Sequence, residues 1–195
     1  MSYWPDDGPV KAFSQRWVQA GGMVWEAQGF AALIEAVGQA WQQLVVPDPT
    51  ASVWPVIYWV NPELETIDWG QIFATRGPVE AWQWGPGKDL RPVASSAVLG
   101  MTGCAWAVAA TGSVALYATD TTGLWPSILP PAHLVLVARP RIVATVAGGL
   151  SLMAGASLPP LFKIVTGPSM TADIEGTLVI GVHGPGRVGA IVYEV

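Results

Sequence analysis

The chain has 195 residues, of which 51% are hydrophobic and 12% are charged, and its formal net charge is −5. This length suits one domain, spanning residues 1–195, with a buried core. Lys and Arg number only nine and form no basic run, which argues against nucleic-acid binding. With Cys104 as the single cysteine, the chain has no internal disulfide and no CxxC pair for zinc or an iron–sulfur cluster. We therefore expect no metal and no bound cofactor.

Three further features bear on location and surface. The amino-terminal stretch "MSYWPDDGPVKAF" has no positively charged lead and no apolar signal core, which predicts a cytoplasmic protein. Residues 93–118 are uncharged and long enough to span a bilayer. However, Thr102-Gly103 and Thr111-Gly112-Ser113 divide them into pieces of strand length, so we expect no membrane span. Eleven Trp residues predict that some aromatic rings lie at an interface with a partner.

The first half of the chain predicts helices and strands in alternation. Apolar residues recur at spacings of three and four in two segments, as on one face of a helix. Segments rich in β-branched and aromatic residues predict strands. Asn61 followed by Pro62 is typical of a helix start. The expected elements are helices over 10–20 and 30–45 and strands over 23–26, 53–60 and 79–84.

The second half alternates more clearly. Strands are expected over 97–101, 113–118, 134–138, 162–165, 178–182 and 188–194. Between the third and fourth of these, Ile142, Val146, Leu150 and Met153 form a helical stripe. Strands that alternate with helices predict an α/β fold with a mostly parallel sheet.

Polar residues gather in loops beside these expected strands. Residues 166–169, "TGPS", begin where the strand 162–165 ends, and residues 183–186, "HGPG", begin where the strand 178–182 ends. Ligands of parallel sheets bind outside the carboxyl ends of the strands. Turn N–H groups and hydroxyls can hold an anion. We therefore expect Thr111, Thr166, Ser169 and His183 on one rim of the sheet, around a pocket for a small carboxylate or phosphate, with Arg187 nearby.

The same residues also have a purely structural interpretation. Ser169 or Thr171 would cap a helical turn "TADIE", with Asp173 and Glu175 favourably placed in its first turn. Asp173 would then pair with Arg187, and His183 would be an ordinary turn residue. The residue pattern leaves both interpretations open.

No catalytic signature is complete in this sequence. "TGPS" lacks the Lys-Ser/Thr ending of a phosphate-binding loop. We expect His133 to be a hydrogen-bonded structural residue and Cys104 to be an inert buried thiol. The catalytic candidates are Asp173, Glu175 and His183. The ligand-binding candidates are Thr102, Thr111, Gly112, Ser113, Thr166, Gly167, Ser169, Thr171, Asp173, His183, Gly184 and Arg187.

Three stretches resemble one protein family. The tail "KIVTGPSMTADIEGTLVIGVHGPGRVGAIVYE", residues 163–194, resembles the end of the LUD domain family, of the lactate utilization protein C type. Residues 100–117, "GMTGCAWAVAATGSVALY", and 127–137, "SILPPAHLVLV", resemble two further motifs of that family. The resemblance covers residues 97–195 well, whereas residues 9–90 fit in element order only.

The resemblance implies a fold and a function. The fold would be a three-layer parallel-sheet α/β fold similar to the NagB/RpiA/CoA-transferase superfamily. The function would be a component supporting oxidation of L-lactate to pyruvate together with iron–sulfur oxidoreductase subunits, by binding a small organic acid or a partner subunit. The alternative is a stand-alone enzyme of the isomerase or acyl/CoA-transfer type. The resemblance leaves open whether the chain is an enzyme and whether it forms a homo-oligomer.

One departure from the family pattern weakens the enzymatic alternative. The family usually carries an acidic residue directly before the T-G-T/S triplet and often an Asp a few residues earlier. Those places correspond here to Ala110 and Ala105. In the related CoA-transferases a Glu at a comparable position is the nucleophile, and an Ala cannot take that role.

Overall fold

The computed structural model describes residues 8–46, 48–154, 159–172, 178–181 and 183–195. Six parallel strands form the main sheet, in the order β1-β12-β7-β4-β2-β3. These strands are β1 (Met23–Gln28), β2 (Trp54–Tyr58), β3 (Val79–Gln83), β4 (Leu99–Thr102), β7 (Ala132–Ala138) and β12 (Arg187–Glu194). Residues of β7 are buried throughout, as expected for a strand covered on both faces.

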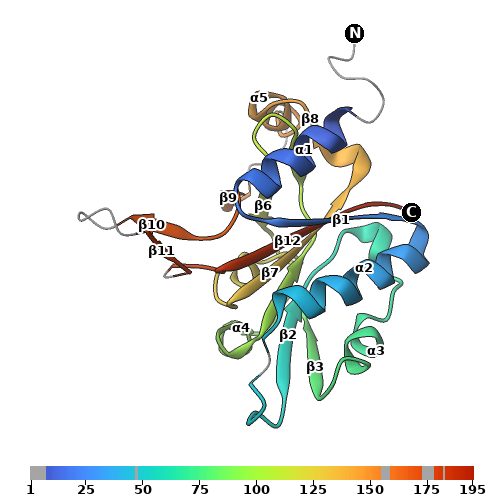
Figure 1. The fold of residues 1–195 in the computed structure, drawn as a ribbon, viewed down its shortest axis with the longest axis vertical. Coiled ribbons are helices and arrows are strands. Elements are labelled where there is room, and N and C mark those ends of the chain that lie inside the picture. Colours follow the sequence, from blue (N-terminus) through green and yellow to red (C-terminus); the bar gives the residue numbers. More distant parts are fainter. Residues whose placement is uncertain (1–7, 47, 155–158, 173–177, 182) are drawn as a thin grey trace.

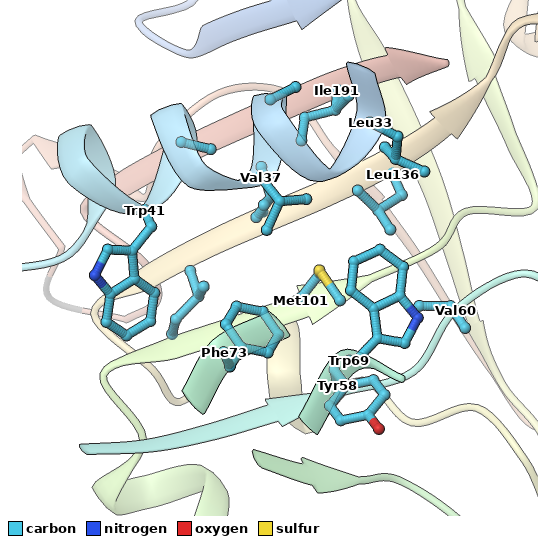
Figure 2. Packing of buried hydrophobic residues seen from close by; sticks show 14 of the residues in the cluster. Leu33, Val37, Trp41, Tyr58, Val60, Trp69, Phe73, Met101, Leu136 and Ile191 are labelled. Carbon is cyan, nitrogen blue, oxygen red and sulfur yellow. The ribbon is translucent and has the colours of Figure 1, made fainter. Parts of the chain in front are cut away.

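Two of the described helices cover one face of this sheet. The helices of the chain are α1 (Gly8–Gln19), α2 (Gly29–Leu44), α3 (Trp69–Ala74), α4 (Arg91–Ser96) and α5 (Val146–Ser151). Apolar side chains of α2 and α3 pack on those of β2, β4, β7 and β12 in one large cluster. Figure 2 shows this cluster, in which Leu33 and Val37 of α2 lie over Leu136 and Ile191 of the sheet.

The other face is covered by α1 and a second sheet. This sheet has the order β8-β5-β6-β9, with β5 (Trp106–Val108), β6 (Ser113–Ala118), β8 (Ile142–Val143) and β9 (Leu161–Val165). Phe13 and Trp17 of α1 pack there with Val135 and Val192 of the main sheet. The helices on one face, the parallel sheet itself and the layer on its other face make three layers, which confirms the expected α/β fold class.

Shorter elements connect the layers. The hairpin of β10 (Met170–Ala172) and β11 (Leu178–Ile180) projects from the side of the molecule opposite α2 and α3 (Figure 1). Three short 3-10 turns are η1 (Pro62–Leu64), η2 (Trp125–Ser127) and η3 (Arg139–Arg141). Asn61 precedes η1 as expected, but its side chain makes no capping hydrogen bond.

Two expectations about the second half are wrong. The helical stripe from Ile142 to Met153 is not one helix, because Ile142 belongs to β8 and Thr145 caps a short α5 by accepting from the N–H of Gly148. The strands at 162–165 and 178–182 do not join the parallel sheet. β9 pairs antiparallel with β6, and β11 pairs antiparallel with β10.

Most of the described Trp residues are buried or half-buried. Trp17, Trp69 and Trp106 are among the largest fully buried side chains, and of the Trp residues that the structure describes only Trp125 is exposed. The expectation that some of them lie at an interface with a partner stays a prediction. Within the described ranges, no helix is long and apolar enough to cross a membrane. The uncharged segment 93–118 forms the end of α4 and then β4, β5, β6 and their connections instead.

Candidate functional site

The polar loops singled out from the sequence lie at the amino edge of the main sheet. Arg187 is the first residue of β12 and pairs with Ala132, the first residue of β7. The residues before Arg187 therefore precede the parallel strands. The expectation that these loops extend from the carboxyl ends of parallel strands is wrong, because β9 and β11 belong to other sheets.

One group of predicted residues forms a chain of hydroxyls beside α1. Ser113 Oγ lies 2.7 Å from Thr111 Oγ1 and 2.6 Å from Thr166 Oγ1. Gly112 and Gly167 have positive φ. A Cβ on Gly112 would collide with the backbone of α1, and a Cβ on Gly167 would collide with the backbone of Ala20, the residue after α1. These glycines thus permit close packing, and the hydroxyls tie β9 to β6. A ligand role for this group stays a prediction.

A second group surrounds the turn after β9. The N–H of Ser169 donates to Pro185 O at 2.9 Å, and the N–H of Gly181 donates to Ser169 O at 2.8 Å. His183 is exposed and, with Gly184, lines a cleft of about 400 Å³. The rest of its described lining is Ile128, Leu129, Pro130, Pro131 and Gly181.

The remaining predicted residues of these loops are Thr171, Asp173 and Glu175. Asp173 and Glu175 lie outside the described residues. Thr171 and Ala172 belong to β10 and pair with β11, so the expected helical turn does not begin there. Whether any of these residues binds a ligand or takes part in catalysis stays a prediction.

Thr102 belongs to a buried polar pair rather than to a loop. Its Oγ1 lies 2.9 Å from His133 Nε2, and both residues are fully buried. Burial, with a smaller contribution from the charge of Lys163, lowers the pKa of His133 to about 3. The imidazole is therefore neutral and structural, as the sequence predicts.

A larger cleft lies at the opposite, carboxyl edge of the main sheet. Strands β2 and β4 are neighbours in this sheet. The next strand of the sheet after β2 in the chain is β3, which lies on the side of β2 away from β4, whereas the next after β4 is β7, which lies on the side of β4 away from β2. Adjacent strands whose connections diverge in this way mark the point where α/β sheets bind ligands. The cleft there measures about 760 Å³. It is lined by Trp59, Val60, Asn61, Pro62, Glu65, Gln83, Trp84, Gly85, Pro86, Lys88, Cys104, Tyr117, Thr119, Thr121, Thr122 and Arg141.

Arg141 is the cation held most firmly in this cleft. Its Nη2 lies 3.6 Å from Glu63 Oε2, and its Nη1 donates to Ala105 O at 3.4 Å. Tyr193 donates its hydroxyl to Glu63 Oε1 at 2.7 Å, and Asn61 Nδ2 donates to Tyr193 Oη at 3.2 Å. Glu63 itself lines a neighbouring cleft of about 580 Å³. The network thus orients the Arg141 guanidinium in the lining of the larger cleft.

Two indoles form a rigid part of the cleft lining. The Trp59 indole N–H donates to Gly123 O at 2.8 Å, and this side chain is 4% exposed. A Cβ on Gly123 would collide with the ring of Trp84, so the backbone at Gly123 lies directly against that ring. Both indoles are therefore held by the same short segment.

Cys104 lines the cleft but is a poor nucleophile. It is 1% exposed, and burial raises the pKa of its thiol to about 12. The reactive form is the thiolate, which is scarce at neutral pH with such a pKa. The structure therefore agrees with the interpretation of Cys104 as an inert thiol.

Sequence reasoning missed this cleft entirely. None of its lining residues was a predicted site residue, because the prediction rested on loops that are dense in polar residues. One usable signal was the "RPR" of residues 139–141. It follows directly on the expected strand 134–138, which is where the carboxyl edge begins.

Comparison with known proteins defines the family. The LUD domain model matches residues 56–193. The chain is 34% identical to lactate utilization protein C of Halalkalibacterium halodurans over 144 residues, 71% of this chain and 62% of that protein. It is 29% identical to lactate utilization protein C of Bacillus subtilis over 150 residues, 72% of this chain and 62% of that protein. The chain thus spans less than two thirds of the length of these relatives.

A solved structure supports the same fold. A crystal structure of a DUF162 family protein from Deinococcus radiodurans superposes with a TM-score of 0.61 over 95% of this chain and 96% of that chain, at 21% identity. The family match covers most of the chain and agrees with the motifs in its second half. The chain is therefore a member of the LUD domain family.

Proposed function

We propose that the chain supports lactate utilization by binding a small organic acid, L-lactate or pyruvate, in the cleft at the carboxyl edge of the main sheet. The names of its relatives supply the metabolic context. Oxidation of lactate releases electrons, and a chain with Cys104 alone cannot hold a cysteine-ligated cluster. Iron–sulfur oxidoreductase partners would therefore accept the electrons.

Arg141 is the observation that carries this proposal. A guanidinium has five N–H donors in a planar fork that matches a carboxylate. The contacts to Glu63 and Ala105 involve two of its nitrogens and orient the group. A carboxylate bound by the remaining donors would form charge-assisted hydrogen bonds, each worth about 1.5–3 kcal/mol.

Binding is better supported than acyl or CoA transfer. Ala110 is exposed and does not line the cleft, and its methyl group offers no nucleophile. The protonated thiol of Cys104 is equally unsuited to attack. What the cleft does supply is a fixed cation among aromatic and hydroxyl groups.

Calorimetric titration of the purified chain with L-lactate, pyruvate and phosphate tests the proposal. We expect heat of binding with at least one of the two acids. Arg141→Gln should weaken that binding at least tenfold, equivalent to about 1.4 kcal/mol. The matched control is Arg91→Gln, because Arg91 is exposed and pairs with Asp89 away from the cleft. Absence of heat with both acids at millimolar concentration would contradict the proposal, as would equal loss in both variants.

A further inference from the structure

We propose that the same cleft also binds a nucleotide, in the sense of a planar heteroaromatic ring joined through a sugar to a phosphate. This inference rests on the proposed use of the cleft as a binding site. It adds a second ligand class beside the small acid. Three independent properties of the cleft lead to it: its volume, its aromatic lining and the position of its charges.

The volume of the cleft exceeds what a small acid needs. At about 760 Å³, the cleft would hold about 25 water molecules at their liquid density of roughly 30 Å³ each. L-lactate or pyruvate would displace only a few of them. Clefts of about 300–1,000 Å³ are typical of sites for much larger, cofactor-sized ligands. Most of the space therefore remains for another group.

The aromatic lining suits a planar ring. Trp84 and Tyr117 line the cleft with half-buried side chains, whereas Trp59 also lines it but is 4% exposed and offers little surface for stacking. The Gly123 segment fixes both indoles, through the hydrogen bond from Trp59 and the close contact with Trp84. A rigid aromatic surface loses little conformational entropy when a ligand stacks on it. Stacking of a nucleic-acid base on an aromatic side chain contributes about 1–3 kcal/mol.

The charged and polar groups suit the rest of a nucleotide. Lys88, in the loop after β3, and Arg141, in η3 after β7, both line the cleft and can bind phosphate oxygens. Glu65 contributes a carboxylate that can accept hydrogen bonds from ribose hydroxyls. Thr119 lies in a turn tied by hydroxyl hydrogen bonds to Thr122. Cations, a sugar acceptor and aromatic rings thus share one cleft.

Calorimetry and tryptophan fluorescence test this inference with four probes. AMP and FMN carry both the ring and the phosphate, adenosine carries the ring and ribose without the phosphate, and ribose 5-phosphate carries ribose and phosphate without the ring. We expect AMP to bind at least tenfold more tightly than adenosine or ribose 5-phosphate. Failure of both nucleotides to bind at millimolar concentration overturns the inference. Equal affinity for AMP and ribose 5-phosphate also overturns it, because the ring would then contribute nothing.

Variants locate the nucleotide in the cleft. Trp84→Leu should weaken nucleotide binding at least tenfold, whereas Trp125→Leu, at an exposed site outside the cleft, should leave it unchanged. Lys88→Gln changes an exposed side chain and should not disturb folding. It should weaken AMP several-fold without affecting adenosine. Unchanged nucleotide affinity in both Trp84→Leu and Lys88→Gln would place the site elsewhere and overturn the inference.

The titrations also separate this inference from the proposed function. Heat with L-lactate or pyruvate but none with AMP and FMN would leave the proposed function standing and reject the nucleotide. Heat with a nucleotide but none with either acid would support the nucleotide and reject the acid.

Discussion

Acidification should destabilise the fold through His133. This side chain is fully buried in β7, its Nε2 lies 2.9 Å from Thr102 Oγ1, and its Nδ1 has no hydrogen-bond partner among the described atoms. Burial, and then the charge of Lys163, lowers its pKa from 6.5 to about 3. The folded protein therefore resists protonation of a group that the unfolded chain protonates readily.

The size of the effect follows from this difference. Between pH 6.5 and about 3 the unfolded chain binds a proton at His133 that the folded chain does not, so the free energy of unfolding falls as the pH falls through that range. Each pH unit within it removes up to about 1.4 kcal/mol. Acidification from pH 7 to pH 5 should thus remove about 2 kcal/mol through this residue, a substantial share of a typical stability of about 5–15 kcal/mol.

Urea unfolding at pH 7 and pH 5 measures the effect in three proteins. His133→Gln removes the titrating group, whereas His183→Gln removes an exposed His and serves as the control. The carboxylates of the chain contribute equally to the pH dependence of unfolding in all three proteins, so the comparison isolates the contribution of His133. Wild type and His183→Gln should lose about 2 kcal/mol more than His133→Gln. An equal loss in all three would refute the account of His133 as a buried neutral group.

Three further predictions concern single positions. Cys104 should react with a thiol reagent at pH 8 only as fast as the fold opens, because it is buried with a pKa of about 12; immediate labelling of native protein would contradict this. Gly112→Ala should lower the free energy of unfolding, measured in urea, by more than about 2 kcal/mol, because this residue has positive φ and a Cβ would collide with the backbone of Trp17. Gly87 also has positive φ but a Cβ there would meet no other atom, so Gly87→Ala should lower the free energy of unfolding by only about 1 kcal/mol. Equal losses in the two variants would argue against the close packing at Gly112. Wild-type protein should not transfer CoA, because the methyl group of Ala110 offers no nucleophile. CoA transfer by the wild type would disprove this, whereas transfer that appears only in Ala110→Glu would support it.

The fold class was predictable because it depends on local pattern. The continuous apolar run of β7 and the amphipathic stripe of α2 each specify an element without reference to distant residues. What local pattern does not specify is the sheet that a strand joins. β9 and β11 read as strands of the parallel sheet but pair antiparallel elsewhere, and this moved the predicted carboxyl edge to the wrong end.

The candidate site was harder to predict than the fold. The sequence drew attention to Thr111, Ser113 and Thr166, yet these hydroxyls bond to one another across β6 and β9. Arg141 stands in the sequence beside only one other charge, Arg139. It acquires meaning only when the fold brings Glu63, 78 positions away (141 − 63), to within 3.6 Å. No local signal encodes such a pair.

The central claim is that the acid binds at the carboxyl edge of the sheet and not in the polar loops at its amino edge. Titration of L-lactate and pyruvate into Arg141→Gln and Arg187→Gln tests it most directly, since one arginine lines the cleft and the other opens β12 at the opposite edge. The account predicts at least tenfold weaker binding in Arg141→Gln and wild-type affinity in Arg187→Gln. Wild-type affinity in Arg141→Gln together with loss of binding in Arg187→Gln would contradict it.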